Sequence, residues 1–192
     1  MPIRIEDITL RPLSISNWDD FETLFGPRGA YGGCWCMWWR LSRKEFAKGQ
    51  GEGNRKAMKA IVESGTVPGL IAYSGDEPCG WCSVAPREHF ASLERSRVLR
   101  RIDDSKVWSL VCFFIDRRFR GRNLCFKLIL GAIEYVKSRQ GKIVEAYPTI
   151  LRSTKAAPVS TFMGIPRIFA RAGFKEVNQP SQSKVIMRYY IE

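Results

Sequence analysis

The chain has 192 residues, of which 45% are apolar and 12% aromatic, and its formal net charge is +12. This length suits one domain with its own hydrophobic core, and the apolar content argues against a disordered chain. No apolar run approaches the roughly 20 residues that cross a bilayer. The opening residues, MPIRIEDITLRP, lack the apolar segment of a signal peptide, so we expect a cytoplasmic protein.

The positive charge is concentrated in the second half of the chain. Residues 1–100 hold 14 basic and 12 acidic side chains, whereas residues 101–192 hold 17 and 7. A local excess of this kind predicts an anionic ligand or a nucleic acid as partner.

Hydrophobic patterning predicts alternating strands and helices in one α/β domain over residues 1–192. In the first half we expect a strand at 8–13, a helix from Ser16 or Asn17 to Phe25, a helix at 54–64, and a hairpin of strands 69–74 and 80–86. A basic helical connector at 90–101 and a central strand at 107–116 follow. The second half predicts a helix ended by Gly141, a strand at 142–148, a loop at 149–161, a helix at 166–173, and strands 174–177 and 184–191.

A basic turn, RRFRGRN, separates the central strand from an amphipathic helix. Leu124, Leu128, Ala132 and Val136 recur every four residues and define the apolar face of that helix. A glycine-containing turn before a helix exposes backbone N–H groups, which together with the helix dipole bind phosphate. An ordinary loop with a solvated basic rim is the alternative. The turn and the first helical residues hold five basic side chains and no acid from position 117 onwards: Arg117, Arg118, Arg120, Arg122 and Lys127.

The segment FFIDRRFRGRNLCFKLI resembles the acetyl-CoA motif R-x-x-G-x-G/A of the GNAT family, the GCN5-related N-acetyltransferases. Phe119, Arg120 and Gly121 match its Tyr/Phe-Arg-Gly, whereas Asn123 and Cys125 replace small residues of the motif. Asn tolerates a positive φ better than most residues. IFARAGF (168–174) is similar to the family's Y-x-x-x-G-F, and GGCWCMWWR with EPCGWCSVAPRE resembles an uncharacterised bacterial subgroup.

This resemblance implies an α/β GNAT fold, with a twisted, mixed, mostly antiparallel sheet of six to seven strands flanked by helices. It implies an N-acetyltransferase that moves an acetyl group from acetyl-CoA, as co-substrate and without a metal, to an amine of a small-molecule or peptide acceptor. The implied roles are pantetheine pairing by Phe113, Phe114 and Ile115, pyrophosphate binding by Arg120, Gly121, Arg122, Asn123, Leu124 and Cys125, a cofactor contact from Phe169, and catalysis by Glu145 and Tyr147.

Three features have competing interpretations. Asp116 is a second candidate base, or a strand-end acid that pairs with the neighbouring arginines. Phe169 stands where the family often has a tyrosine that protonates the departing thiolate, so Tyr147, water or no acid serves that role. CWCMWWR, with three tryptophans in five residues, lines an acceptor pocket or belongs to the core or to a homodimer contact.

Three other functions remain open at this point. The chain could bind acyl-CoA without catalysis, since Asn123, Cys125 and Phe169 depart from the family pattern. Two cysteine pairs, Cys34 with Cys36 and Cys79 with Cys82, could together bind zinc, although C-x-C is not the usual spacing. A nucleic acid could bind the basic segment formed by Arg95, Arg97, Arg100 and Arg101, although no recognition motif accompanies it. No membrane partner is expected.

Overall fold

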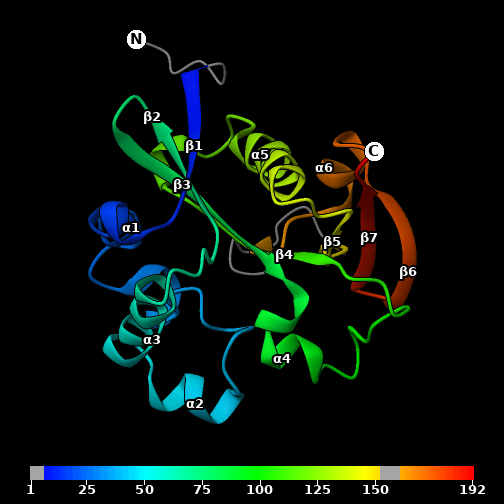
Figure 1. The fold of residues 1–192 in the computed structure, drawn as a ribbon, viewed down its shortest axis with the longest axis horizontal. Coiled ribbons are helices and arrows are strands. Elements are labelled where there is room, and N and C mark those ends of the chain that lie inside the picture. Colours follow the sequence, from blue (N-terminus) through cyan, green and yellow to red (C-terminus); the bar gives the residue numbers. More distant parts are fainter. Residues whose placement is uncertain (1–6, 152–160) are drawn as a thin grey trace.

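A computed structural model describes residues 7–151 and 161–192 of the chain (Figure 1). Its strands form one seven-stranded mixed sheet in the order β1-β2-β3-β4-β5-β7-β6. β4 and β5 pair in parallel and the other neighbours pair antiparallel, as the predicted GNAT architecture requires. The strands are β1 (Ile8–Pro12), β2 (Leu70–Ser74), β3 (Glu77–Pro86), β4 (Trp108–Ile115), β5 (Ile143–Ala146), β6 (Lys175–Ser181) and β7 (Lys184–Tyr190).

Helices cover both faces of the sheet (Figure 1). α5 and α6 lie on one face, and α1 to α4 lie on the other. The helices are α1 (Trp18–Phe25), α2 (Arg43–Lys48), α3 (Glu52–Glu63), α4 (Ala91–Glu94), α5 (Leu124–Ser138) and α6 (Pro166–Arg171). The apolar stripe predicted for α5 is buried against the sheet, with Leu128, Ala132 and Val136 at 0% exposure.

Two helical segments differ from the sequence prediction. The short helix α2 was not expected, although Ser42 and Glu45 form a capping box at its start. The predicted helix at 90–101 is wrong beyond Glu94. The Arg87 side chain donates to the carbonyls of Leu93 and Leu99 there, and the chain after Glu94 follows an irregular path around this guanidinium. Most of the predicted loop at 149–161 lies outside the described residues.

Candidate active site

The sheet opens between its two parallel strands. β4 and β5 are paired only from Trp108 to Leu110, opposite Val144 to Ala146. β3 stays paired with β4 as far as Ile115, but its register shifts between Ser83 and Val84, which leaves Val111 as an extra residue on β4. A bulge of this kind bends its strand. The splay between β4 and β5 therefore begins where β4 is bulged.

Part of the splayed gap is bridged by residues 161–164. The Phe113 N–H donates to the Phe162 carbonyl at 2.7 Å, and the Thr149 N–H donates to the Gly164 carbonyl at 2.9 Å. Gly164 has a φ of +80°, and a Cβ at this position would lie 2.6 Å from the Phe169 ring. A side chain at this position would therefore collide with Phe169, so the close approach to that ring requires glycine.

The residues expected to pair with pantetheine have different orientations. Backbone groups of alternate strand residues point to opposite neighbours. Phe113 faces the gap because its N–H reaches Phe162, and Ile115 faces the same way. Phe114 turns its backbone toward β3, where it pairs with Trp81. By this alternation Phe113 and Ile115 are better placed than Phe114 to pair with pantetheine, and all three roles stay predictions.

The turn after β4 takes the conformation that its sequence suggests. Asp116 accepts a hydrogen bond from the Arg118 N–H at 2.8 Å and caps the turn. Gly121 has a φ of +74° and Asn123 a φ of +56°, so both occupy the left-handed region. Asn123 is the residue before α5, and the first N–H groups of that helix have no acceptor within it. The turn thus presents exposed backbone donors at the end of the β4 strand.

Two further members of the predicted pyrophosphate set begin α5. Leu124 is buried at 4% exposure in the core beneath the helix, so only its backbone can serve a ligand. The Cys125 side chain is half-buried and packs against the same core. Its burial raises the pKa of the thiol to about 12. The Cys125 side chain is therefore a neutral group that packs against the core.

The basic side chains of the turn are not equivalent. Arg118 forms ion pairs with Glu77 at 2.6 Å and with Asp116 at 3.0 Å. Arg120 donates through Nε to the Ile115 carbonyl at 3.0 Å. Arg122 is exposed, and no described carboxylate pairs with it. Arg122 is therefore available to an anion, Arg118 is already neutralised, and Asp116 is the strand-end partner of an arginine.

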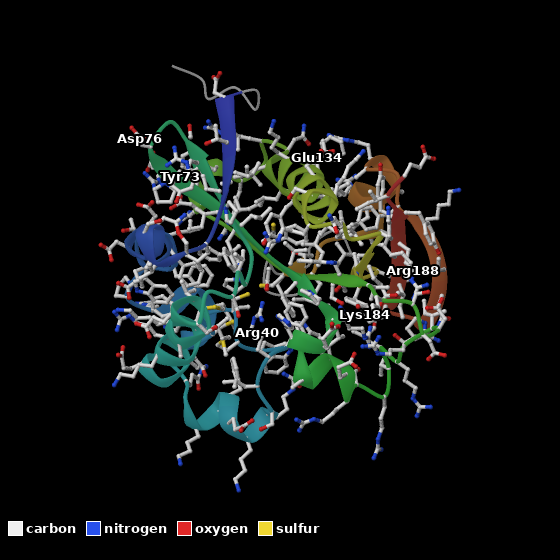
Figure 2. The ribbon with its side chains drawn as sticks, viewed as in Figure 1. Arg40, Tyr73, Asp76, Glu134, Lys184 and Arg188 are labelled. Carbon is white, nitrogen blue, oxygen red and sulfur yellow. The ribbon has the colours of Figure 1, made fainter. Side chains whose placement is uncertain are left out.

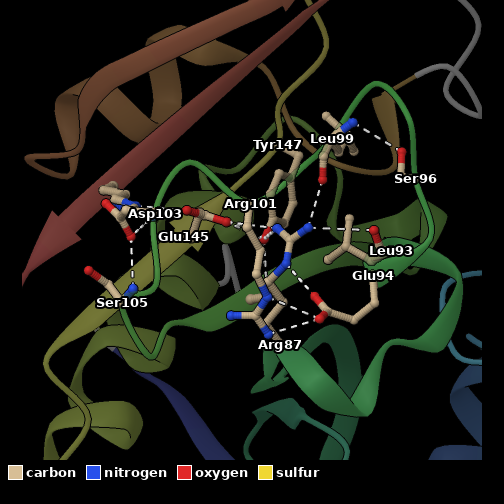
Figure 3. Close-up of polar contacts among 12 residues, drawn as sticks. Arg87, Leu93, Glu94, Ser96, Leu99, Arg101, Asp103, Ser105, Glu145 and Tyr147 are labelled. Atoms are coloured by element: carbon tan, nitrogen blue, oxygen red, sulfur yellow. Dashed lines mark hydrogen bonds and ion pairs between the residues drawn. The ribbon is translucent and has the colours of Figure 1, made fainter.

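Glu145 and Tyr147 lie together in a buried ionic network beside the gap (Figure 3). Glu145 is 1% exposed, and its two oxygens accept from Arg87 Nη1 at 2.9 Å and from Arg188 Nε at 2.7 Å. The Tyr147 hydroxyl donates to Glu145 at 2.7 Å and accepts from Arg87 at 2.9 Å. It also lies 2.7 Å from the Ser109 hydroxyl. The structure thus brings the two proposed catalytic side chains into direct contact.

Other side chains already engage the polar atoms of both residues: Glu145 accepts from Arg87, Arg188 and the Tyr147 hydroxyl. Burial, followed by the charge of Glu145, raises the pKa of Tyr147 well above its ordinary value, so the phenol stays neutral. Arg87 continues the network to Glu94 at 2.6 Å, and Arg188 continues it to Asp103. Glu145 and Tyr147 are therefore part of the ionic network that joins the ends of β3, β5 and β7, and their catalytic roles stay a prediction.

Phe169 is buried at 0% exposure on the α5 side of the gap. Its ring lies 6.0 Å from that of Phe113 and 5.1 Å from that of Phe174, between ring centroids. The predicted cofactor contact of Phe169 is compatible with this place at the gap, although the ring is covered by residues 161–164 in this structure.

The cysteine pairs do not form a zinc site. Cys36 packs among the residues beneath α1 and α3, whereas Cys79 and Cys82 pack on the opposite face of the sheet beneath α5. The zinc hypothesis is therefore wrong for this set, because the sheet separates its members. Across residues 7–151 and 161–192, no group of three or more His, Cys, Asp or Glu side chains could hold a metal ion.

The basic segment after α4 is partly committed to internal contacts. Arg101 pairs with Glu94 at 2.9 Å, and the Leu99 carbonyl accepts from Arg87 at 2.6 Å. Arg95, Arg97 and Arg100 are exposed. The segment does not have the helical register assumed for a nucleic-acid surface, since α4 ends at Glu94.

Sequence reasoning missed Lys184, which lies at the open end of β5 (Figure 2). Its ammonium donates to the Thr149 hydroxyl at 2.8 Å and to the Tyr147 carbonyl at 3.4 Å, and no carboxylate in the described ranges pairs with it. Burial lowers the pKa of Lys184 to about 8. A lone lysine at the start of a strand carries no signal in the sequence, because its position at the gap depends on the pairing of β7 with β5.

A model of the acetyltransferase (GNAT) family matches residues 35–157. The chain belongs to this family. Among solved structures, it is similar to a polyamine N-acetyltransferase of Drosophila melanogaster that forms N-acetylagmatine, with 13% identity, a TM-score of 0.57 and coverage of 96% of this chain and 100% of that one.

Two further structures share the fold. The PaiA N-acetyltransferase of Thermoplasma acidophilum, solved with coenzyme A, is 15% identical at a TM-score of 0.53 and covers 96% of this chain and 99% of its own. A GNAT-family acetyltransferase of Streptococcus agalactiae is 13% identical at a TM-score of 0.55, with 96% of each chain covered. A search of curated proteins found no match. In the described part of this GNAT protein, no helix has the length and apolar character needed to cross a membrane.

Proposed function

We propose that this GNAT protein is an acetyl-CoA-dependent N-acetyltransferase that acts on a primary amine of a small-molecule or peptide acceptor. The observation that carries the proposal is the gap between β4 and β5, which opens directly beside the unpaired N-terminus of α5. Family membership supports the acetyltransferase class. Bound acetyl-CoA would supply the activated acetyl group.

The residues of the chain divide the work of binding. The N–H groups around Gly121 and Asn123 would hold the pyrophosphate, with Arg122 as the available side-chain cation. Ile115 and Phe113 would pair with the pantetheine arm through the backbone groups that face the gap. For Phe113 this requires that its N–H leave the Phe162 carbonyl.

Proton transfer then falls to groups other than the predicted pair. Each oxygen of Glu145 already accepts a hydrogen bond from an arginine, and Oε1 also accepts from the Tyr147 hydroxyl. Alignment of the amine with the thioester accounts for most of the expected rate enhancement. Water can remove the proton of the attacking amine.

Titration with acetyl-CoA tests the binding step. We expect saturable binding by calorimetry, and we expect Arg122→Met to weaken it about fivefold, because it removes a cation of the turn that no described carboxylate pairs with. Arg118→Met is the matched control and should change affinity less than about twofold, since Arg118 is already neutralised by two acids. Free CoA release across a panel of amines then reports transfer. No binding of acetyl-CoA would contradict the proposal.

A non-catalytic acyl-CoA-binding role is the second candidate. It is favoured by the contact between Phe113 and Phe162, which occupies a backbone donor of the gap. It is also favoured by Phe169, which has no hydroxyl to protonate a thiolate. Binding of acetyl-CoA without CoA release from any amine in the panel would select this role over the enzyme.

Replacing Phe169 by tyrosine tests the departure from the family pattern. We expect turnover to be preserved or raised, because the added hydroxyl lies at the gap and can reach the departing thiolate. Without ligand the hydroxyl would be buried beside Phe113 and Gly164, so stability should fall by about 1–3 kcal/mol. Thermal melts and CoA-release rates give the two readouts. A collapse of turnover with intact folding would contradict the alignment of IFARAGF with Y-x-x-x-G-F.

A further inference from the structure

A buried arginine without an acidic partner lies on the other face of β3 and β4. Arg40 is 7% exposed and donates through Nη2 to the Pro68 carbonyl at 2.9 Å and to the Ser83 hydroxyl at 3.4 Å. Its Nε is buried and has no hydrogen-bond partner, and no described carboxylate pairs with it. A buried guanidinium is stable only near a compensating negative charge. Arg40 also lies 4.4 Å from the centroid of the Phe90 ring, and a neighbouring anion would stabilise it further.

The candidate anion is the sulfur of Cys36, which is 4% exposed and acts electrostatically on Arg40. Trp81 Nε1 donates to this sulfur at 3.2 Å. Cys112 packs against the same cluster and lies opposite Ser83, whose hydroxyl contacts Arg40. Cys112, Arg40 and Ser83 all lower the pKa of Cys36. Figure 2 shows sulfur atoms gathered beside Arg40 in the interior. Several donors directed at one sulfur are the environment of a thiolate, because a neutral thiol accepts weakly.

The backbone holds Cys36 in a costly conformation. Trp35 has a φ of +44° and Cys36 a φ of +59°, which non-glycine residues rarely adopt. A Cβ on Gly29 would lie 2.2 Å from the Trp35 indole, so the loop before them is packed tightly. Such conformations persist where the surroundings over-determine them, and they are common at functional sites.

The three neighbouring thiols differ in ionisation. The hydrogen bond from Cys112, with those of Trp81 and Ser83 and the charge of Arg40, outweighs burial and lowers the pKa of Cys36 to about 7. Burial raises the pKa of Cys34 to about 11. The hydrogen bond to Cys36, followed by burial, raises the pKa of Cys112 well above its ordinary value. Cys36 is therefore the thiol of this cluster that ionises most readily near neutral pH.

We propose that Cys36 is an oxidation site for hydrogen peroxide and that Cys112 is the thiol that resolves it into a disulfide. The proposal rests on the cluster in which Trp81 and Ser83 of β3 bring Cys36, Arg40 and Cys112 together, and on the Arg40 Nε that has no partner. It does not depend on acetyl transfer. Cys34 and Cys112 are half-buried, so the cluster approaches the surface although Cys36 itself does not.

The chemistry balances in two steps. The Cys36 thiolate attacks one peroxide oxygen, the O–O bond breaks, and the departing hydroxide takes a proton to give water and a sulfenic acid. Cys112 then attacks this sulfur as its thiolate, an S–S bond forms, and the hydroxyl leaves with the Cys112 proton as a second water. Each disulfide consumes one peroxide, which is the oxidant. The product ties the segment around Cys36 to β4, next to the bulge where the gap begins.

The first test uses the wild-type protein. We expect iodoacetamide at neutral pH to label Cys36 about tenfold faster than Cys125, because the thiolate is the nucleophile. Burial alone predicts the reverse order, since Cys36 is the more buried of the two. The groups that act on Cys36 are Cys34 and Arg40 from its own segment, Trp81 and Ser83 from β3, and Cys112 from β4, while α1 and α3 contribute apolar side chains. Labelling of Cys36 should rise between about pH 6 and 8 as the thiolate forms.

Peptide mass spectrometry after peroxide treatment gives the second test. We expect a Cys36–Cys112 disulfide in the unreduced digest. Cys112→Ser should instead leave a sulfenic acid on Cys36 that dimedone traps. Disulfides at other positions, or no oxidation of Cys36 before Cys125, would overturn the proposal.

Two arginine variants complete the design. Arg40→Met should slow the labelling of Cys36 about tenfold at neutral pH, because the thiolate loses its counter-charge. Arg43→Met is the matched control, since Arg43 stacks on Trp38 at 3.4 Å and does not act on the thiol. An unchanged rate in a folded Arg40→Met protein would overturn the role of Arg40. If that variant does not fold, the wild-type labelling order and Cys112→Ser still decide the proposal.

Discussion

Replacing Arg87 by methionine should lower the free energy of unfolding by about 3–5 kcal/mol. The Arg87 side chain is 0% exposed and binds Glu145, Glu94, Tyr147 and the Leu99 carbonyl (Figure 3). Methionine fills much of the volume but leaves the buried carboxylate of Glu145 with Arg188 as its remaining cation. The cost is therefore chiefly that of uncompensated buried polar groups. Urea unfolding followed by tryptophan fluorescence measures it.

Arg101→Met is the matched control for this experiment. Arg101 also pairs with Glu94, at 2.9 Å, but its side chain is 38% exposed. A pair in contact with solvent contributes below about 1 kcal/mol. If Arg87→Met and Arg101→Met were equally mild, the network around Glu145 would not be the framework described, and Glu145 would again become a candidate base.

Replacing Asn123 by valine should weaken acetyl-CoA binding between about fivefold and a hundredfold. Asn123 holds a φ of +56° at the start of α5, and a β-branched residue in this region costs about 1–3 kcal/mol. The chain would relieve that strain by turning the peptide, and the N–H groups of the turn would no longer converge on a phosphate. Calorimetric titration with acetyl-CoA measures the loss.

Asn123→Gly is the control at the same position. Glycine adopts a positive φ without cost and restores the residue of the family motif. We expect it to bind acetyl-CoA at least as tightly as the wild type. Because the Asn123 side chain is exposed, neither change removes packing. Equal affinity in the valine and glycine variants would show that the turn does not hold the phosphate.

The strands and helices around the β4–α5 unit could be predicted from sequence because their signals are local. Two such signals are the apolar run at 107–116 and the four-residue spacing on α5. Each follows from residues close together in the sequence and does not depend on the rest of the chain. The connector at 90–101 could not be predicted in this way. Its path depends on Arg87, a residue on another element whose guanidinium binds the carbonyls of the connector.

The candidate site likewise contains residues that local sequence signals predicted and residues that only tertiary contacts bring to the gap. The turn residues 120–125 were proposed because a glycine-containing turn before a helix exposes backbone N–H groups that can bind phosphate. Glu145 looked like a base in the sequence, since nothing there shows that Arg87 and Arg188 approach it from β3 and β7. Residues 161–164 and Lys184 carried no motif, and they reach the gap only through tertiary contacts.

The sequence by itself determined most of the strands and helices, the family and a candidate phosphate-binding turn, because backbone preference and hydrophobic period act over a few residues. The tertiary structure decided which charges are available. Ion pairs engage Arg118 and Glu145. The sheet separates Cys36 from Cys79 and Cys82, and Arg40 lies in the electrostatic reach of the Cys36 sulfur. The physical reason is that ionisation and pairing depend on burial and on neighbours distant in sequence.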